Sequence, residues 1–330
     1  MALHETEHDT GSRPAAGAAF SFADRLLEEL RRRRIRLWVD GGRLHYDAPA
    51  HAIDDRILGL LRRHRDTLVQ RLLHAEEPTA GPGTPGSQWL RPLKQTPHGT
   101  NTVVFVIPAA GSGPSTYRSW AEAAPEGLDV VCVHLPGREE RFAEEPYTTV
   151  GPLADRIAHE VAGHLADSAR PFVLFGHSAG GLIGYEVARR LDSARLKLLA
   201  VAASTPPSEA HTADLTDTEL LDALRDWGGT PEEALSDSAV RTAVLPRLRA
   251  DLAVVASCHR PWSEAARLAV PIVVFAGAED ESGTPEDCAA WSHWTTDGFR
   301  LHTVPGGHFF PAQQPARLLR TIAETVSGAG

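Results

Sequence analysis

The sequence predicts an α/β fold, with a mainly parallel sheet covered by helices on both faces, preceded by a small α-β-β-α module. Three observations predict this arrangement. Short apolar runs alternate with helical patterns from residue 101 onward, a G-x-S-x-G pentapeptide follows one of these runs, and a hairpin pattern lies near the start of the chain. With 330 residues, 42% of them hydrophobic, the chain can bury the core of one ordinary domain and a small one.

The front module, residues 19–73, is predicted to form a helix, a hairpin and a second helix. The stretch "RIRLWVDGGRLHYDAP" has strand-forming residues on both sides of Gly41 and Gly42, and a glycine pair supplies the positive φ angles of a short hairpin turn. Apolar residues at helical spacing flank it, namely Phe22, Leu26, Leu27 and Leu30 before the hairpin and Ile57, Leu60, Leu61, Leu68 and Leu72 after it. A two-stranded sheet has two unpaired edges, so we expect a further strand to be added there.

The charge of this module differs from that of the rest of the chain. Residues 19–73 hold 12 arginines against 8 carboxylates, a net charge of +4, whereas the whole chain carries −10. The excess indicates either a solvated basic face or a site for an acidic peptide. The run Arg31–Arg34 has no interleaved aromatic residues and matches no nucleic-acid-binding motif, so we expect no nucleic acid partner.

A linker is predicted at residues 74–100, where nine of 27 residues are proline or glycine and no periodicity is visible. Within this stretch, Trp89 and Leu90 either dock onto the following domain or are exposed. The domain from 101 to 330 follows, and its candidate strands are "TVVFVI", "DVVCVH", "PFVLF", "LKLLAVAA", "PIVVFA" and "FRLHTV". Such runs, alternating with helices, are typical of a parallel sheet buried on both faces.

Composition also limits location and cofactors. The cysteines Cys132, Cys258 and Cys288 are odd in number, far apart and in no C-x-x-C pattern, so neither a disulfide framework nor a zinc site is indicated. We expect no metal and a reducing, cytoplasmic location. No apolar run approaches the roughly 20 residues that span a bilayer, so no membrane partner is expected.

The pentapeptide Gly176–Gly180 lies between a predicted buried strand and a helix, a setting in which Ser178 is exposed on a sharp turn at the strand end. Serine needs a base that is itself oriented by a carboxylate, in the order Ser, Asp, His. Asp280 and His308 each follow a later strand, and they are the expected acid and base. Glu279, Glu281 and Asp287 are competing carboxylates, and His177 is expected to be structural.

An oxyanion hole needs two fixed N–H donors. The backbone N–H of Ala179, the residue after the nucleophile, is the first expected donor. The loop "IPAAGSG" after the first strand supplies the second expected donor, either Ala109 or Ala110.

Residues 101–325 resemble the type II thioesterases of nonribosomal peptide and polyketide assembly lines. The resemblance rests on "IPAAGSG", "LPGREERFAEEP", "LRDWGGTPEEALSD", "LPRLRAD" and "GGHFF". It implies an α/β-hydrolase fold with a mobile helical lid at about residues 205–265 and a triad of Ser178, Asp280 and His308. It also implies that the substrates are acyl thioesters on the phosphopantetheine arm of carrier proteins, with no cofactor in the enzyme itself. The family's usual Gly-His-Ser-Met-Gly is "GHSAG" here, which leaves more room beside the serine.

The front module resembles docking domains of the TubC type. The resemblance implies that the hairpin accepts an acidic C-terminal segment of a partner subunit as an added strand, with contacts from Arg34, Arg36, Trp38, Arg43 and Tyr46. Self-association of the module into a homodimer is an alternative.

The sequence therefore predicts a thioesterase that acts in trans in nonribosomal peptide or polyketide biosynthesis, for product release or for proofreading. Two other functions stay open. One is an esterase or lipase for free small esters, and the other is a noncatalytic docking adaptor.

Overall fold

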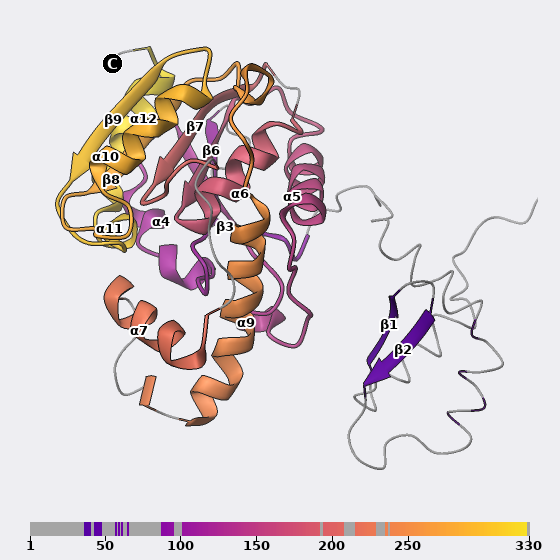
Figure 1. Ribbon diagram of the computed structural model, residues 1–330. Helices are drawn as coiled ribbons and strands as arrows, with labels where there is room; N and C mark the ends of the chain where they lie inside the picture. The colour runs from indigo at the N-terminus through magenta and orange to yellow at the C-terminus, as the bar shows by residue number, and fades with distance from the viewer. Residues whose placement is uncertain are drawn as a thin grey trace, which may run out of the picture. The chain divides into compact units, whose positions relative to one another are not determined.

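A computed structural model describes residues 36–40, 43–47, 57, 59, 61, 65, 87–95, 101–191, 194–207, 215–228, 235–236 and 238–328 (Figure 1). The chain divides into two compact units, residues 1–80 and 81–330. Each unit is described by itself.

The front unit contains the predicted hairpin. Strand β1 (Arg36–Asp40) pairs antiparallel with β2 (Arg43–Asp47), and Asp40 lies opposite Arg43, so residues 41–42 alone connect the strands. The hairpin prediction is confirmed. Of the residues expected to bind a partner, Arg36 and Trp38 lie in β1, Arg43 and Tyr46 lie in β2, and Arg34 lies outside the described residues.

Part of the second predicted helix is also described. Ile57, Gly59, Leu61 and Arg65 are helical, and Ile57 and Leu61 are each 5% exposed. Their spacing of four residues places them on one face of the helix, as the apolar pattern predicts. The first predicted helix, before the hairpin, lies outside the described residues.

The second unit contains a seven-stranded sheet in the order β3-β5-β4-β6-β7-β8-β9 (Figure 1). The six strands from β4 to β9 are parallel, and β3 is antiparallel to its neighbour β5. The strands are β3 (Leu90–Lys94), β4 (Thr102–Ile107), β5 (Leu128–Val133), β6 (Phe172–His177), β7 (Leu196–Ala202), β8 (Ile272–Gly277) and β9 (Phe299–Val304). The six strands predicted from apolar runs are confirmed.

Alternation along the strands builds a core on each face of the sheet. In β4, Val103 and Phe105 belong to one buried cluster, whereas Val104 and Val106 belong to the other, because successive side chains in a strand point to opposite faces. Every residue of β4, β5, β6 and β8 is buried. Continuous apolar runs, rather than alternating ones, are therefore the pattern that this sheet requires.

Helices cover both faces. The first cluster includes side chains of α5 and α6, and the second includes side chains of α4 and α12. The helices are α4 (Trp120–Ala123), α5 (Val150–His164), α6 (Ala179–Ala188), α7 (Asp217–Trp227), α9 (Ser238–Ser257), α10 (Pro285–Ala289), α11 (Phe310–Gln313) and α12 (Pro315–Val326). Short 3₁₀ turns are η1 (Pro114–Tyr117), η2 (Glu139–Arg141), η3 (Glu264–Ala266) and η4 (Ala290–Trp294).

The predicted linker at 74–100 extends too far at its C-terminal end. Residues 90–94 form β3 at the edge of the sheet, and the Trp89 side chain is 6% exposed. The indole lies against the guanidinium groups of Arg141 and Arg156, at 4.4 Å and 5.1 Å from the ring centre. Trp89 and Leu90 therefore dock onto the domain that follows them. An edge strand tolerates Pro92, which concealed the strand in a stretch rich in proline and glycine.

The segment predicted as a lid contributes α7 and α9, between β7 and β8 in the chain. The C-terminal half of α9 is part of the main core, where Val254, Val255 and Cys258 are buried. In addition, the Ser257 hydroxyl accepts a hydrogen bond from the Val150 N–H at 2.7 Å. This half of α9 is too firmly packed to move as a lid. Mobility of the remaining part, up to about Pro246 in the interior of α9, stays a prediction.

The three cysteines, Cys132, Cys258 and Cys288, are buried and form no disulfide bonds. Burial raises the pKa of Cys258 and of Cys288 to about 12, and that of Cys132 still further. Within the described residues, no helix combines the length and the apolar character needed to cross a bilayer.

Candidate active site

Ser178 lies on a sharp turn between β6 and α6, at the carboxyl edge of the sheet. Its backbone has φ 53° and ψ −119°, a conformation that side-chain-bearing residues seldom adopt. Two backbone hydrogen bonds hold the turn, from Ser178 N–H to Ala202 O and from Gly181 N–H to Ser178 O, each 2.8 Å long. Strained backbone of this kind is concentrated at functional sites.

The glycines on either side of the serine are required by close backbone contacts. A Cβ atom on Gly176 would lie 2.1 Å from Gly180 O, and one on Gly180 would lie 2.1 Å from Ile107 O. No side chain fits at these distances. The spacing G-x-S-x-G is therefore the sequence that allows β4, β6 and α6 to approach one another at the serine.

Asp280 and His308 meet at the same edge, after β8 and β9. His308 Nδ1 lies 2.9 Å from Asp280 Oδ2, and the two residues are 8% and 5% exposed. The Ser282 hydroxyl donates to Asp280 Oδ1 at 2.7 Å and lies 3.0 Å from His308 Nδ1. An Nδ1–H donated to the carboxylate leaves His308 Nε2 as the acceptor that a serine nucleophile needs.

Burial alone would raise the pKa of Asp280. The hydrogen bond and charge of His308, together with the hydrogen bonds from Ser282, outweigh burial and hold the pKa of Asp280 below its ordinary value. The carboxylate is thus ionised at neutral pH.

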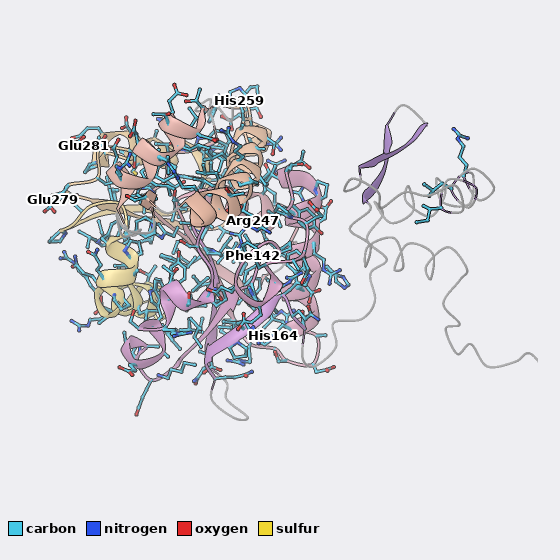
Figure 2. All side chains as sticks on the ribbon, turned by 90° about the horizontal axis from the view of Figure 1, so that it is seen from below. Phe142, His164, Arg247, His259, Glu279 and Glu281 are labelled. Atoms are coloured by element: carbon cyan, nitrogen blue, oxygen red, sulfur yellow. The ribbon has the colours of Figure 1, made fainter. Side chains whose placement is uncertain are left out.

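The competing carboxylates do not reach His308 in this arrangement. Glu279 and Glu281 are exposed, and Figure 2 shows both at the outer edge of the domain. Asp287 lies in the first turn of α10, where its N–H and carboxylate bond to the Thr284 hydroxyl.

His177 joins the serine turn to the histidine loop and to η1. It is fully buried, its Nε2 lies 2.9 Å from His308 O, and its Nδ1 lies 2.9 Å from the Tyr117 hydroxyl. The arrangement fits a neutral ring that donates from Nε2 and accepts at Nδ1. Burial and the nearby His308 lower the pKa of His177 to about 3, so the ring stays neutral.

This buried histidine predicts a pH dependence of stability. Since its pKa falls from 6.5 in the unfolded chain to about 3 in the folded one, the unfolded state binds more protons between these values. The free energy of unfolding should therefore fall as the pH drops from 6.5 towards 3, by about 1.4 kcal/mol per pH unit for one proton. The free energy of unfolding, measured with denaturant at several pH values across this range, should change less steeply with pH in His177→Gln than in the original protein.

The matched control is His259→Gln, because His259 is exposed (Figure 2). It should leave the slope unchanged. Equal slopes for the original protein and His177→Gln would contradict a neutral buried ring.

The loop after β4 supplies the second expected oxyanion donor. The Ala109 N–H donates to the Tyr117 hydroxyl at 3.2 Å and is thereby engaged, which leaves Ala110 as the better of the two predicted donors. Ala179 is the first residue of α6, so its N–H is one of the groups without an acceptor inside the helix.

Helix α7 reaches the site from the lid segment. The indole of Trp227 at its C-terminal end stacks on the His308 ring, with centroids 6.0 Å apart and planes inclined by 26°. An apolar cavity lies beside Ala179, lined by Ala110, Leu135, Leu153, Ile183 and Val254 together with Pro108, Ala109, Arg138 and Asp251.

Among the described residues, one group of three metal-type ligands lies close together: His134, Glu139 and Glu140. Both ring nitrogens of His134 already have partners, since Nδ1 accepts from Arg91 and Nε2 faces Arg138 O. These hydrogen bonds, and the ion pair of Glu140 with Arg91, account for the group without a metal ion.

Three contacts of the site were not predicted from the sequence: those of Tyr117, Ser282 and Trp227. The position of Ser282, two residues after Asp280, is a weak local signal, because such a residue can return a hydrogen bond to an aspartate. The other two contacts have no local signal.

A sheet of this topology, with a strained serine at one strand end and an Asp–His pair at the same edge, is typical of hydrolases of the α/β class. Residues 102–326 match the family described as "Thioesterase domain". The chain belongs to this family, and it is a hydrolase that acts on thioesters. Residues 24–73 match the "TubC N-terminal docking domain".

Several known proteins are similar to this chain. Gramicidin S biosynthesis protein GrsT of Aneurinibacillus migulanus is 33% identical over 214 residues, which is 63% of this chain and 82% of that protein. The solved type II thioesterase BorB from the borrelidin biosynthetic cluster is 31% identical, with a TM-score of 0.63 over 74% of this chain and 99% of its own. The thioesterase RedJ from the prodiginine pathway of Streptomyces coelicolor is 34% identical, with a TM-score of 0.62 over 75% and 96% of the two chains.

Proposed function

We propose that this thioesterase acts in trans on acyl, aminoacyl or peptidyl groups carried by the phosphopantetheine arm of carrier proteins in nonribosomal peptide or polyketide assembly. One observation carries the proposal: a single chain matches both a thioesterase domain and a docking domain. The first supplies the chemistry, and the second supplies a means of reaching one particular synthetase or synthase. The biosynthetic names of GrsT, BorB and RedJ support the same setting.

The proposed mechanism uses Ser178, His308 and Asp280 as one unit. Ser178 Oγ attacks the thioester carbonyl while His308 Nε2 takes its proton, and Asp280 stabilises the resulting imidazolium. The N–H groups of Ala179 and Ala110 stabilise the oxyanion. The tetrahedral intermediate collapses to an acyl-serine and a thiolate, which takes the proton from His308. Water, deprotonated by His308, then hydrolyses the acyl-serine to the free acid.

The substrate class is tested by comparing one acyl group on two leaving groups. The protein should hydrolyse an acyl-phosphopantetheinyl carrier domain with a higher kcat/KM than the p-nitrophenyl ester of the same acid. A preference for the free ester would indicate an esterase or lipase. Turnover of neither substrate would indicate a noncatalytic adaptor.

The front module is expected to be dispensable for chemistry and required for delivery. Its proposed ligand is an acidic C-terminal segment of a partner subunit, which pairs with an edge of the β1–β2 hairpin. The net charge of +4 on residues 19–73 supports an acidic ligand, and the contact should weaken at high salt. No nucleic acid, membrane, metal or cofactor has a role in this proposal, and the location proposed for it is the cytoplasm.

Removal of residues 1–80 tests this delivery role. The cut is placed before β3, because the second unit begins at Gly81 and Trp89 packs in its core. The shortened protein should hydrolyse a small soluble thioester within about twofold of the full chain. On the cognate synthetase, at low enzyme concentration, its rate should fall by about 10²-fold, since tethering raises the effective concentration of the substrate.

A full-length Arg36→Glu/Arg43→Glu variant provides the control for charge, and it should lose rate on the synthetase only. Equal losses on both substrates would make the module a structural support of the hydrolase. Equal retention on both would exclude docking from the reaction. Sedimentation of the front module at several concentrations would separate partner binding from homodimer formation.

A further inference from the structure

A buried ion pair lies beside the loop that carries Ala110. Arg138, in the loop after β5, donates from Nη2 to Asp251 Oδ1 of helix α9 at 2.7 Å, and the two side chains are 9% and 10% exposed. Burial of two charges costs desolvation free energy that their attraction often only balances, so stability alone is a weak reason for such a pair. Its other contacts indicate a more specific role.

Both partners of the pair hold the backbone of this loop. Asp251 Oδ2 accepts a hydrogen bond from the Gly111 N–H at 2.7 Å, and Arg138 Nη1 donates to Ser112 O at 3.0 Å. The Gly111 N–H belongs to the peptide unit that directly follows Ala110. The ion pair therefore fixes the plane of this peptide unit from the side of α9.

The Pro108–Ala109 peptide unit has a separate anchor, because the Ala109 N–H donates to Tyr117. The Ala109–Ala110 unit, which carries the Ala110 N–H, lies between the two anchored units. Gly111 adopts φ +71°, a conformation that glycine reaches readily and leaves readily. Inside the loop, the Ser112 N–H donates to Ala109 O at 3.0 Å, in the same peptide unit as the Ala110 N–H. The contacts with Asp251, Arg138 and Tyr117 hold this turn from outside. Together these hydrogen bonds fix the direction of the Ala110 N–H, which lies between the two anchored peptide units.

We propose that Asp251 and Arg138 are positioning residues that aim the Ala110 N–H at the oxyanion of the transition state. This inference rests on the proposed function, since it requires acyl transfer to Ser178. Donors fixed in advance stabilise a developing oxyanion without reorganisation during the reaction. The motifs "LPGREE" and "LPRLRAD" then act together on the oxyanion hole, although Arg138 of the first and Asp251 of the second are 113 residues apart in the sequence.

The central variant is Asp251→Asn, which keeps the volume of the side chain. Each carboxylate oxygen of Asp251 faces an N–H donor, one from Gly111 and one from Arg138. In the asparagine variant the NH₂ group replaces one of these oxygens and must face one of the two donors. We expect kcat on an acyl thioester to fall about tenfold to 100-fold, less than the loss from removing an oxyanion donor altogether, with KM changed by less than about threefold. A boronic acid analogue of the acyl group, which forms a tetrahedral adduct with serine, should lose affinity by the same factor as kcat.

The pair Arg170–Asp129 provides a matched control. It is also buried, but Asp129 lies near the amino end of β5, away from the carboxyl edge where the site is. Asp129→Asn should lower the thermal unfolding midpoint and leave both kcat and boronate affinity unchanged. Arg138→Lys is the second test, because an ammonium group does not reproduce the fork that reaches Asp251 and Ser112 together.

The proposal is overturned if Asp251→Asn and Asp129→Asn lower kcat equally, or if Asp251→Asn changes KM while kcat and boronate affinity stay constant. If Asp251→Asn does not fold, the same comparison of kcat with boronate affinity in Arg138→Lys decides. Failure of the proposed function has a different signature, since full activity in Ser178→Ala, or a boronate that does not inhibit the original protein, would refute acyl transfer itself.

Discussion

Replacing Ser178 with alanine is expected to lower thioester hydrolysis by about 10⁴- to 10⁶-fold, because members of a triad act as a unit and loss of the nucleophile removes the acyl-enzyme route. The observation behind this expectation is the strained turn at the end of β6, which presents the serine at the edge where Asp280 and His308 meet. Intact-mass measurement with a slow acyl or phosphonate substrate should show one adduct on the original protein and none on the variant.

Ser204→Ala is the control for this experiment. Ser204 lies just after β7, the strand next to β6, and its hydroxyl bonds to Thr205 O rather than to the Asp280–His308 pair. This variant should keep activity within a few-fold and should still form the adduct. An adduct that survives in Ser178→Ala would assign the nucleophile to another residue.

Replacing Asp280 with asparagine should lower kcat by about 10⁴-fold. The carboxylate accepts the Nδ1–H of His308, whereas an amide can present its NH₂ group to that nitrogen and select the tautomer with the proton on Nε2. In that tautomer the ring can no longer accept the serine proton. Steady-state kinetics with a soluble thioester at neutral pH measure the loss.

Glu279→Gln and Glu281→Gln change the charge by the same amount on either side of Asp280. Both residues are exposed, and both variants should keep nearly full kcat. Ser282→Ala should give an intermediate loss, since it removes one hydrogen bond to Asp280 but leaves the Asp280–His308 contact. A loss in Glu279→Gln or Glu281→Gln as large as that in Asp280→Asn would contradict this assignment of the acid.

The parallel sheet could be predicted from the sequence because its information is local. In β4, six consecutive residues are buried on both faces, so the strand appears as an uninterrupted apolar run. The serine turn is equally local, since the two glycines that permit it are within two residues of Ser178. The order of Asp280 and His308 at later strand ends follows from the parallel topology, which brings their loops to one edge.

The contacts around the site could not be predicted in the same way because they join distant parts of the chain. Tyr117 meets His177 across 60 residues, and Arg138 meets Asp251 across 113. No periodicity or turn signal relates such positions. The strand β3 was not predicted for a different reason. It is an edge strand, paired on one side only, and its sequence "LRPLK" contains two charged residues and a proline in place of an apolar run.

The three buried cysteines have a consequence for an enzyme whose substrate is a thioester and whose product is a thiol. With a pKa of about 12 for Cys258 and Cys288, and a higher one for Cys132, only about one thiol in 10⁵ or fewer is a thiolate at pH 7, and the thiolate is the reactive form. Acyl groups delivered to this protein therefore meet no competing sulfur nucleophile among these residues.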